Sequence, residues 1–278
     1  MMKTYMIVDV KKKINVLKQS HGKLITNFYF GSIDDMQKAE CLENDKALVF
    51  VVQEPFRKRV YFAAADPAAC SALLSQLPEN SVLEYICQDN SNPFEQVFIN
   101  GGMERYTRYI RITMTYSENP YMVPEAGRRK LLQEMYDPEF GEYAGEEHAV
   151  QLYQTSREVF DELCDDIFTL EKWKKIIADK ECMVYYENGE LIAYYVYRLE
   201  GKKFYSNLSV NRGSANYLYN LERRVFEEMW NKGIRTFYYW INEDNAKALR
   251  RGNEKVKMYM KSYHEIYNFI YTKIRFIS

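Results

Sequence analysis

A tight turn between two apolar runs restricts the fold of this chain more than any other feature. Residues 183–186 and 191–197 are largely apolar and aromatic, and the dipeptide Asn188-Gly189 lies between them. Asn-Gly is strongly preferred in two-residue hairpin turns because both residues tolerate the positive φ that such a turn requires. The pattern therefore predicts an antiparallel hairpin, which places this part of the chain in a sheet.

Hydrophobic periodicity predicts that helices and strands alternate through the rest of the second half. Apolar residues that recur three or four positions apart indicate amphipathic helices, and short apolar runs between turn residues indicate strands. This alternation favours an α+β fold, in which helices pack on a mixed, mostly antiparallel sheet. The predicted strands lie at 204–210, 235–241 and 263–274, and the predicted helices at 159–168, 173–177, 218–230 and after Asn245.

The first half of the chain shows a similar order of elements. Asp66-Pro67 is a typical helix start, because Asp caps the first turn and Pro is tolerated in it. The two halves therefore indicate an internal repeat of architecture rather than of sequence, although α+β domains often share such orders. The predicted strands lie at 47–52, 59–64, 81–87 and 106–116, and the predicted short helices at 67–77 and 93–99.

The stretch between the two halves lacks clean periodicity. It contains three prolines around one predicted helix at 128–135. Prolines at this density are typical of connecting segments. The sequence therefore predicts two domains, at 1–118 and 146–278, joined by a linker at 119–145.

Composition restricts the partners of the protein. The 38 Lys and Arg residues nearly balance the 39 Asp and Glu residues, so the sequence does not indicate the basic surface that nucleic acid requires. The 25 tyrosines are typical of half-buried sheet surface, and an RNA-binding alternative would need a basic groove. No apolar run approaches the roughly 20 residues that span a bilayer, and no secretory signal is evident. We expect a cytoplasmic protein without membrane or nucleic-acid partners.

Cysteine and histidine spacing predicts no metal site. The chain has five cysteines and three histidines. The cysteines form no Cys-x-x-Cys pair, and no two histidines have the spacing of metal ligands. The cysteines are interpreted as free thiols, mostly buried.

A strand-to-helix loop in the second half resembles a known anion-binding motif. The strand at 204–210 is followed by Asn-Arg-Gly-Ser-Ala at 211–215 and then by the long amphipathic helix. Backbone amides at a helix start bind anions, and Arg212 would add a charge-assisted contact. The loop is similar to the Arg-Gly-x-Gly/Ala loop with which proteins of the GNAT superfamily of N-acyltransferases hold the pyrophosphate of acyl-CoA. An ordinary strand-to-helix turn is the alternative interpretation.

The resemblance implies two GNAT-like domains in tandem, of which the first is a degenerate copy without the loop. It further implies that the second domain binds acetyl-CoA or another acyl-CoA and transfers the acyl group to an amine of a small molecule or peptide. The strand before Arg212 would align the pantetheine arm, and a backbone amide near 208–210 would polarise the thioester carbonyl. The segment from Asn242 resembles the part of the family that lies beside this arm. The residues expected to bind the cofactor are Leu208, Val210, Arg212, Gly213, Ser214, Ala215, Asn216 and Asn245.

The sequence departs from the family pattern where catalysis would occur. The strand at 204–210 has no carboxylate, and its hydroxyl side chains, Tyr205, Ser206 and Ser209, are not bases at neutral pH. Gly252 stands where many members of the family have a tyrosine that acts as general acid. No catalytic residue is therefore assigned. A GNAT-fold binding or scaffold protein without chemistry is the alternative function, and a homodimer is also compatible with the sequence.

Overall fold

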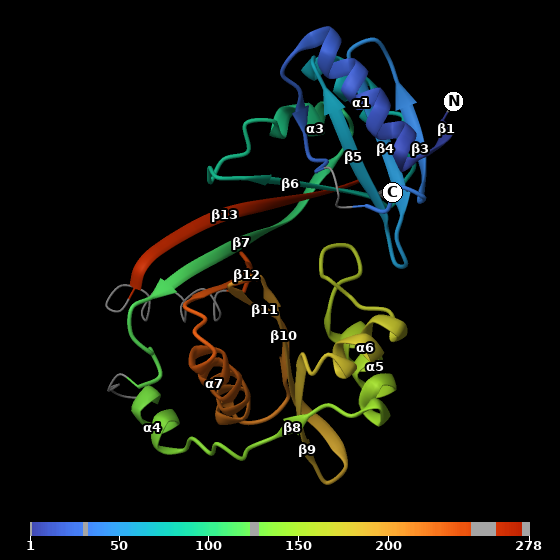
Figure 1. The fold of residues 1–278 in the computed structure, drawn as a ribbon. Helices are drawn as coiled ribbons and strands as arrows, with labels where there is room; N and C mark the ends of the chain where they lie inside the picture. Colours follow the sequence, from blue (N-terminus) through green and yellow to red (C-terminus); the bar gives the residue numbers. More distant parts are fainter. Residues whose placement is uncertain (1, 30–32, 123–127, 246–259, 274–278) are drawn as a thin grey trace. The chain divides into compact units, whose positions relative to one another are not determined.

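The computed structural model describes residues 2–29, 33–122, 128–245 and 260–273. The chain forms two compact units, coloured along the sequence in Figure 1. The first unit consists of Met1–Tyr109, Glu162–Asp165 and Ile266–Ser278, and the second of Ile110–Asp161 and Asp166–Glu265. Two long strands, β7 (Glu104–Tyr116) and β13 (Met260–Lys273), contribute residues to both units.

The first unit is a mixed sheet with helices on both faces. Its strands follow the order β1-β3-β4-β5-β6-β13, with β2 beside β5, and only β5 and β6 in this order run parallel. The strands are β1 (Lys3–Met6), β2 (Ile25–Thr26), β3 (Lys38–Glu43), β4 (Ala47–Gln53), β5 (Lys58–Ala64) and β6 (Ser81–Cys87), and the helices are α1 (Ile7–His21), α2 (Pro67–Leu74) and α3 (Glu95–Asn100).

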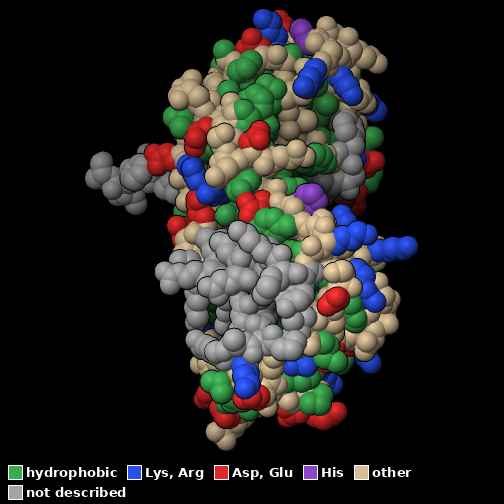
Figure 2. Space-filling model, turned by 90° about the vertical axis from the view of Figure 1, so that its left-hand side faces the viewer, with side chains coloured by type: hydrophobic (Ala, Val, Ile, Leu, Met, Phe, Trp, Pro, Cys, Tyr) green, Lys and Arg blue, Asp and Glu red, His purple; other side chains and the backbone are tan. Residues whose placement is uncertain are grey.

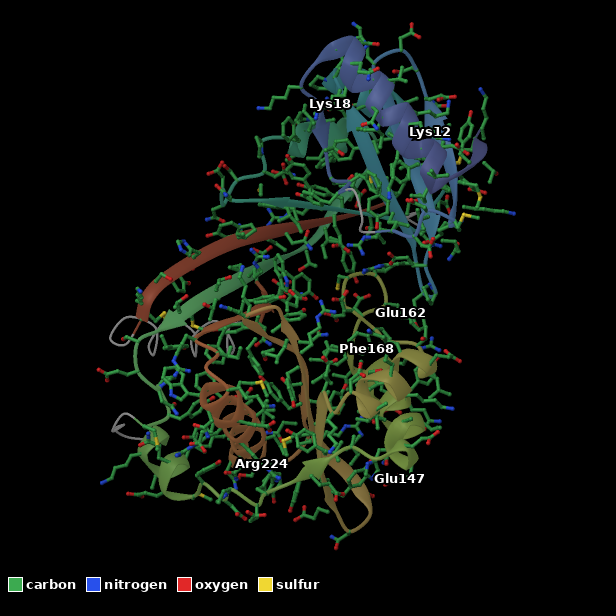
Figure 3. All side chains as sticks on the ribbon, in the orientation of Figure 1. Lys12, Lys18, Glu147, Glu162, Phe168 and Arg224 are labelled. Atoms are coloured by element: carbon green, nitrogen blue, oxygen red, sulfur yellow. The ribbon has the colours of Figure 1, made fainter. Side chains whose placement is uncertain are left out.

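Alternating side chains of the central strands fill two cores in the first unit. Val49 and Val51 of β4 pack with α2 and α3, whereas Leu48 and Phe50 pack with α1 on the opposite face. This division follows from the two-residue period of a strand, and it makes both faces of β4 apolar. The outer side of α1 is mostly polar, with Lys12 and Lys18 exposed (Figure 3).

The second unit has the same layered design. Its strands follow the order β7-β12-β11-β10-β9-β8. Helix α7 packs on one face, with Leu221, Val225 and Met229, and helices α5 and α6 pack on the other, with Leu152 and Trp173. The elements are α4 (Arg128–Glu134), β8 (Glu142–Tyr143), a short 3-10 helix (Glu146–His148), α5 (Ala149–Val159), α6 (Leu170–Ala178), β9 (Cys182–Glu187), β10 (Glu190–Glu200), β11 (Lys203–Asn211), α7 (Ala215–Asn231) and β12 (Thr236–Asn242).

The structure confirms the predicted hairpin and most of the predicted elements. Strands β9 and β10 pair antiparallel, and Asn188 and Gly189 have φ values of 53° and 81°. Positive φ at both positions is the geometry that the Asn-Gly dipeptide predicts. The mixed sheet with flanking helices agrees with the predicted fold class.

The helix predicted at 159–168 is wrong. Helix α5 lies earlier in the chain and ends at Val159, and Phe160 already has extended dihedrals, with φ −104° and ψ 149°. Phe160 and Phe168 nevertheless pack on the core between α5, α6 and the sheet. The ring of Phe168, which is labelled in Figure 3, lies edge-to-face against that of Trp173, with 5.4 Å between ring centroids. Loop residues that reach a core therefore produced apolar spacing that resembled a helix.

Surface charges, cysteines, possible metal ligands and helix lengths bear on the expectations from the sequence. On the face shown in Figure 2, acidic and basic side chains are interspersed. All five cysteines are free thiols, and three of them are buried. In the part of the chain that the structure describes, no group of three His, Cys, Asp or Glu side chains is arranged to hold a metal ion. No described helix is long and apolar enough to cross a membrane.

An exposed ion pair in the first unit makes stability depend on pH. Lys13 Nζ donates to Glu43 Oε2 over 2.7 Å, and this hydrogen bond is the main reason that the pKa of Glu43 lies below its ordinary value. Because the folded-state pKa is lowered, the stabilisation is present above the unfolded-state pKa of about 4.3 and is lost as pH falls through the folded-state pKa.

Glu43→Gln is therefore expected to lower the free energy of unfolding at neutral pH by less than about 1 kcal/mol. The difference from the wild type should disappear at acidic pH. Urea unfolding of both proteins at a series of pH values measures this. A difference that persists unchanged into acid would contradict the assignment.

Candidate functional site

Strands β11 and β12 run side by side and then separate. They pair in parallel over four residues each, from Lys203 to Ser206 and from Thr236 to Tyr239. Strand β11 continues to Asn211 and β12 to Asn242 without further pairing between them. The separated ends, 207–211 and 240–242, therefore leave backbone groups that the ladder between these two strands does not use. Such groups can bind an extended ligand.

A β-bulge marks the point of separation. Tyr197 of β10 pairs with Ser206, but its neighbour Val196 pairs with Leu208, so Asn207 is the additional residue in β11. Bulges often occur beside functional sites because they redirect side chains. The side-chain oxygen of Asn207 is buried and has no hydrogen-bond partner among the described residues. Sequence reasoning missed this residue, because no local pattern reveals a bulge.

The register of β10 and β11 decides which amides face the separated edge. Arg212 N donates to Ile192 O over 2.9 Å, at the end of this antiparallel pair. Because amide directions alternate along a strand, the amides of Val210 and Leu208 also face β10, whereas those of Ser209 and Asn211 face the opposite edge. The side chains of Leu208 and Val210 are buried in the core beneath α5 and α6. The amides of Ser209 and Asn211 thus point away from β10, and no described strand pairs with them.

The loop from β11 to α7 is held by Asn211. Its Oδ1 accepts from Gly213 N and its Nδ2 donates to Ser214 O, both over 3.0 Å. Ser214 is the N-cap of α7, but its side chain makes no capping hydrogen bond. The first-turn amides of Ala215 and Asn216 therefore have no side-chain cap from Ser214. Uncapped amides at a helix start favour a bound anion.

Arg212 stands beside this helix start and is paired with Glu158. The distance from Arg212 Nη2 to Glu158 Oε2 is 2.8 Å, and the two side chains are 46% and 64% exposed. Exposed pairs of this kind contribute about 1 kcal/mol or less. The guanidinium can therefore exchange Glu158 for another anion at little cost.

Close packing explains the glycine in the loop. A Cβ built on Gly213 would lie 2.7 Å from Ile192 Cγ2 and 2.7 Å from two ring carbons of Tyr217. The Tyr217 ring also lies 4.7 Å from the Tyr185 ring and 5.4 Å from the Phe140 ring, between centroids. Any side chain at position 213 would therefore displace this aromatic group and the loop with it.

The charge of a carboxylate on α7 acts on two tyrosines of the strands beside β11, although β11 itself has no carboxylate. Burial is the main cause that raises the pKa of Tyr195 and Tyr239, and the charge of Glu222 on α7 adds to it in both cases. Tyr195 is also hydrogen-bonded to Ser206, beside the bulge. The residues of the strand alone do not reveal Glu222, which lies on α7 and comes to this face only through tertiary packing.

The predicted segment after β12 is described only at its start. Asn245 N donates to Asn242 O over 3.0 Å, and Asp244 N donates to Asn242 Oδ1 over 2.9 Å. The helix predicted after Asn245 and the residue Gly252 lie outside the described residues. Of the predicted cofactor residues, the structure therefore brings together those from 208 to 216.

Comparison with known proteins identifies the fold. No protein-family model matches the chain, and no curated protein matches its sequence. A GCN5-related N-acetyltransferase from Sphaerobacter thermophilus is similar in structure, with TM-score 0.55, 12% identity and coverage of 99% of this chain and 96% of the other. A GNAT acetyltransferase from Colwellia psychrerythraea gives TM-score 0.52, 11% identity and coverage of 98% and 100%. The predicted GNAT fold is confirmed at the level of structure.

Proposed function

We propose that the protein is an N-acyltransferase whose second unit binds acyl-CoA, in the simplest case acetyl-CoA. The observation that carries the proposal is the separation of β11 and β12 beside the uncapped start of α7. The pantetheine arm would lie along the separated ends, where the amides of Ser209 and Asn211 are free to donate. The pyrophosphate would be held by the loop from Arg212 to Asn216. The acceptor would be an amine of a small molecule or a peptide.

The residues at this site suit an acyl-CoA and its reaction. The cofactor supplies an activated thioester. Free amides on β11 can donate to its carbonyl oxygen, where negative charge develops during attack. The acceptor nitrogen must lose a proton, and Glu222, on the α7 side of the strands, is the candidate to take it through a water molecule between the separated ends. The buried acceptor oxygen of Asn207 can receive an N–H from the cofactor arm, which would give it the partner that it lacks.

The first unit also contains two parallel strands that separate, but one of its own side chains occupies the space between them. Strands β5 and β6 pair in parallel at only three positions, from Lys58 to Val60. Beyond them, the side chain of Asn27 connects the two strands. Its Nδ2 donates to Val60 O and to Glu84 O, each over 3.0 Å, and its Oδ1 accepts from Phe62 N over 2.8 Å. Asn27 therefore occupies the backbone groups that a cofactor arm would use.

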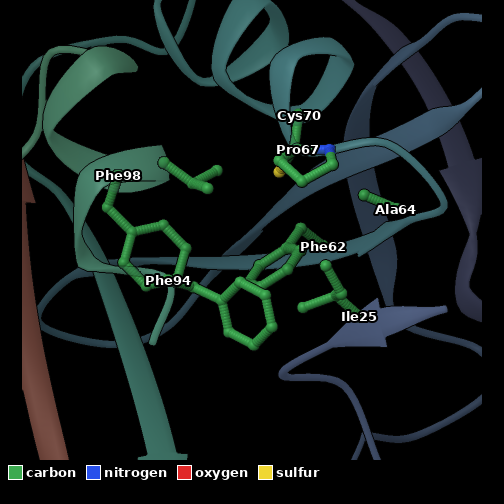
Figure 4. A pocket seen from close by; sticks show the side chains of 8 residues that line it. Ile25, Phe62, Ala64, Pro67, Cys70, Phe94 and Phe98 are labelled. Carbon is green, nitrogen blue, oxygen red and sulfur yellow. The ribbon is translucent and has the colours of Figure 1, made fainter. Parts of the chain in front are cut away.

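The helix start in the first unit is also unsuited to a phosphate. The carboxylate of Asp66 caps α2 by accepting from Ala69 N over 2.8 Å, so a negative charge already stands there. The small pocket nearby has only apolar lining (Figure 4). We therefore propose that this unit is a degenerate GNAT-like copy without cofactor. The pocket is lined by Ile25, Phe62, Ala64, Pro67, Cys70, Phe94, Val97 and Phe98.

A binding protein without chemistry is the second candidate. It is favoured by the side chains of β11 around the bulge, Tyr205, Ser206 and Asn207, which include no group that titrates near neutral pH. An assay of free CoA thiol distinguishes the transferase from the binding protein. The release of this thiol from acetyl-CoA is measured in the presence of a pool of small amines and peptides. Amine-dependent release supports the transferase. Acetyl-CoA binding without any amine-dependent release would favour the binding protein.

A further inference from the structure

A partly buried cluster of arginine and aromatic side chains lies on the face of the second unit's sheet opposite to α7. Ile112, Met114 and Tyr116 of β7 pack with α7, so the alternation of the strand turns Arg111 to the other face. On that face the guanidinium of Arg111 lies 5.6 Å from the ring centroids of both Tyr238 and Trp240. The apolar core beneath α5 and α6 includes no described residue of β7 or β12. The helices of this face therefore pack over other strands.

Aromatic stacking holds the Arg111 side chain in place. The ring of Tyr238 lies parallel to that of Tyr205, with centroids 4.6 Å apart and planes at 6°. Arg111 stacks on the far end of this arrangement, and its Nε is buried without a hydrogen-bond partner among the described residues. A planar guanidinium on aromatic rings is positioned before any ligand binds, which lowers the entropic cost of binding.

Arg111 lacks the acidic partner that its counterpart on the same face has. Arg198 stacks on Tyr205 at 5.0 Å, and its Nη2 is paired with Glu200 Oε1 over 2.7 Å. Glu200 also accepts from the Tyr238 hydroxyl, and the charge of Asp166 acts on Tyr205. In the described part of the chain, neither these acids nor any other carboxylate forms an ion pair with Arg111. A half-buried cation without a counter-charge is costly, and an anionic ligand would remove that cost.

The position of Trp240 links this cation to the candidate site. Trp240 is the first residue of β12 beyond its pairing with β11, at the point where the strands separate. The face that carries α7 is filled by the core of that helix, so an acceptor would approach the separated strands from the face of Arg111. A group bound by Arg111 would then lie close to the reacting amine of the same molecule.

We infer that the acceptor amine carries an acidic group, a carboxylate or a phosphate, which binds Arg111. This inference rests on the proposed acyltransferase function, because it places the acceptor at the separated strands. The guanidinium can donate two parallel hydrogen bonds to either group, and such charge-assisted pairs are stronger than neutral hydrogen bonds. Amines without an acidic group would lack this contact.

Two matched pairs of probes test the inference without knowledge of the natural acceptor. β-Alanine is compared with propylamine, and phosphoethanolamine with ethanolamine, by following the Arg111 Nε–H resonance of the full chain in ¹H–¹⁵N NMR titrations. The acidic member of at least one pair should shift this resonance saturably and bind at least about tenfold more tightly than its partner without an acidic group. The pair that shows the larger difference distinguishes carboxylate from phosphate recognition.

Arginine substitutions complete the test. Arg111→Gln should abolish the preference for the acidic probe in titrations that follow the probe signals, and Arg111→Lys should retain part of it. Arg198→Gln, which removes an arginine that is already paired, should leave it unchanged. Equal binding of the probes with and without an acidic group, no saturable shift, or the same preference in Arg111→Gln would overturn the inference. Acetyl-CoA binding to the same samples is measured separately, so failure of the cofactor site is distinguishable from failure of the acceptor assignment.

Discussion

Arg212→Glu is expected to weaken acetyl-CoA binding at least about a hundredfold, which corresponds to about 2.7 kcal/mol. The substitution removes a guanidinium beside the start of α7 and places a carboxylate where phosphate would bind. It also adds a second negative charge next to Glu158, which now pairs with Arg212. Calorimetric titration of both proteins with acetyl-CoA measures the loss.

Glu158→Gln is the matched control for this prediction. It removes the anion that competes for Arg212 and leaves the loop unchanged, so acetyl-CoA affinity should rise by about two- to fivefold. Both side chains are largely exposed, so neither substitution should disturb the fold. If Arg212→Glu binds acetyl-CoA as the wild type does, the loop is an ordinary strand-to-helix turn.

Asn27→Ala should destabilise the first unit by about 2–3 kcal/mol, because three backbone groups lose their partner at once. The side chain is part-buried and serves Val60 O, Glu84 O and Phe62 N simultaneously. Urea unfolding measures the change, with Asn15→Ala as control because Asn15 is exposed on α1. Equal stability of the two variants would show that Asn27 does not hold the strands.

The elements that the sequence predicted correctly depend on local patterns. The hairpin follows from Asn188-Gly189, strand β4 from the uninterrupted apolar run at 47–52, and α7 from one apolar face. The helix predicted at 159–168 does not form, because this segment makes tertiary contacts instead of helical hydrogen bonds. Leu163 O accepts from Arg57 Nη1 over 2.9 Å, and such a contact over 106 residues of separation has no local signal.

The candidate site was predictable only in part. The loop at 211–216 has a recognisable composition, but the separation of β11 from β12 depends on strand register, which is a nonlocal property. Simple alternation would place Phe204 and Leu208 on the same face. They lie in opposite cores, because the bulge at Asn207 shifts the strand by one residue. The contact of Arg111 with Tyr238 and Trp240 likewise depends on strand pairing between segments far apart in the sequence.

One calorimetric titration of the wild-type chain with acetyl-CoA tests the central claim most directly. We predict a single site per chain with a Kd of micromolar order, or about 8 kcal/mol of binding free energy, and a matching rise in Tm. A stoichiometry of two would contradict the proposal that Asn27 and Asp66 close the first unit to the cofactor. Absence of binding would contradict the assignment of the separated strands and the α7 start as an acyl-CoA site.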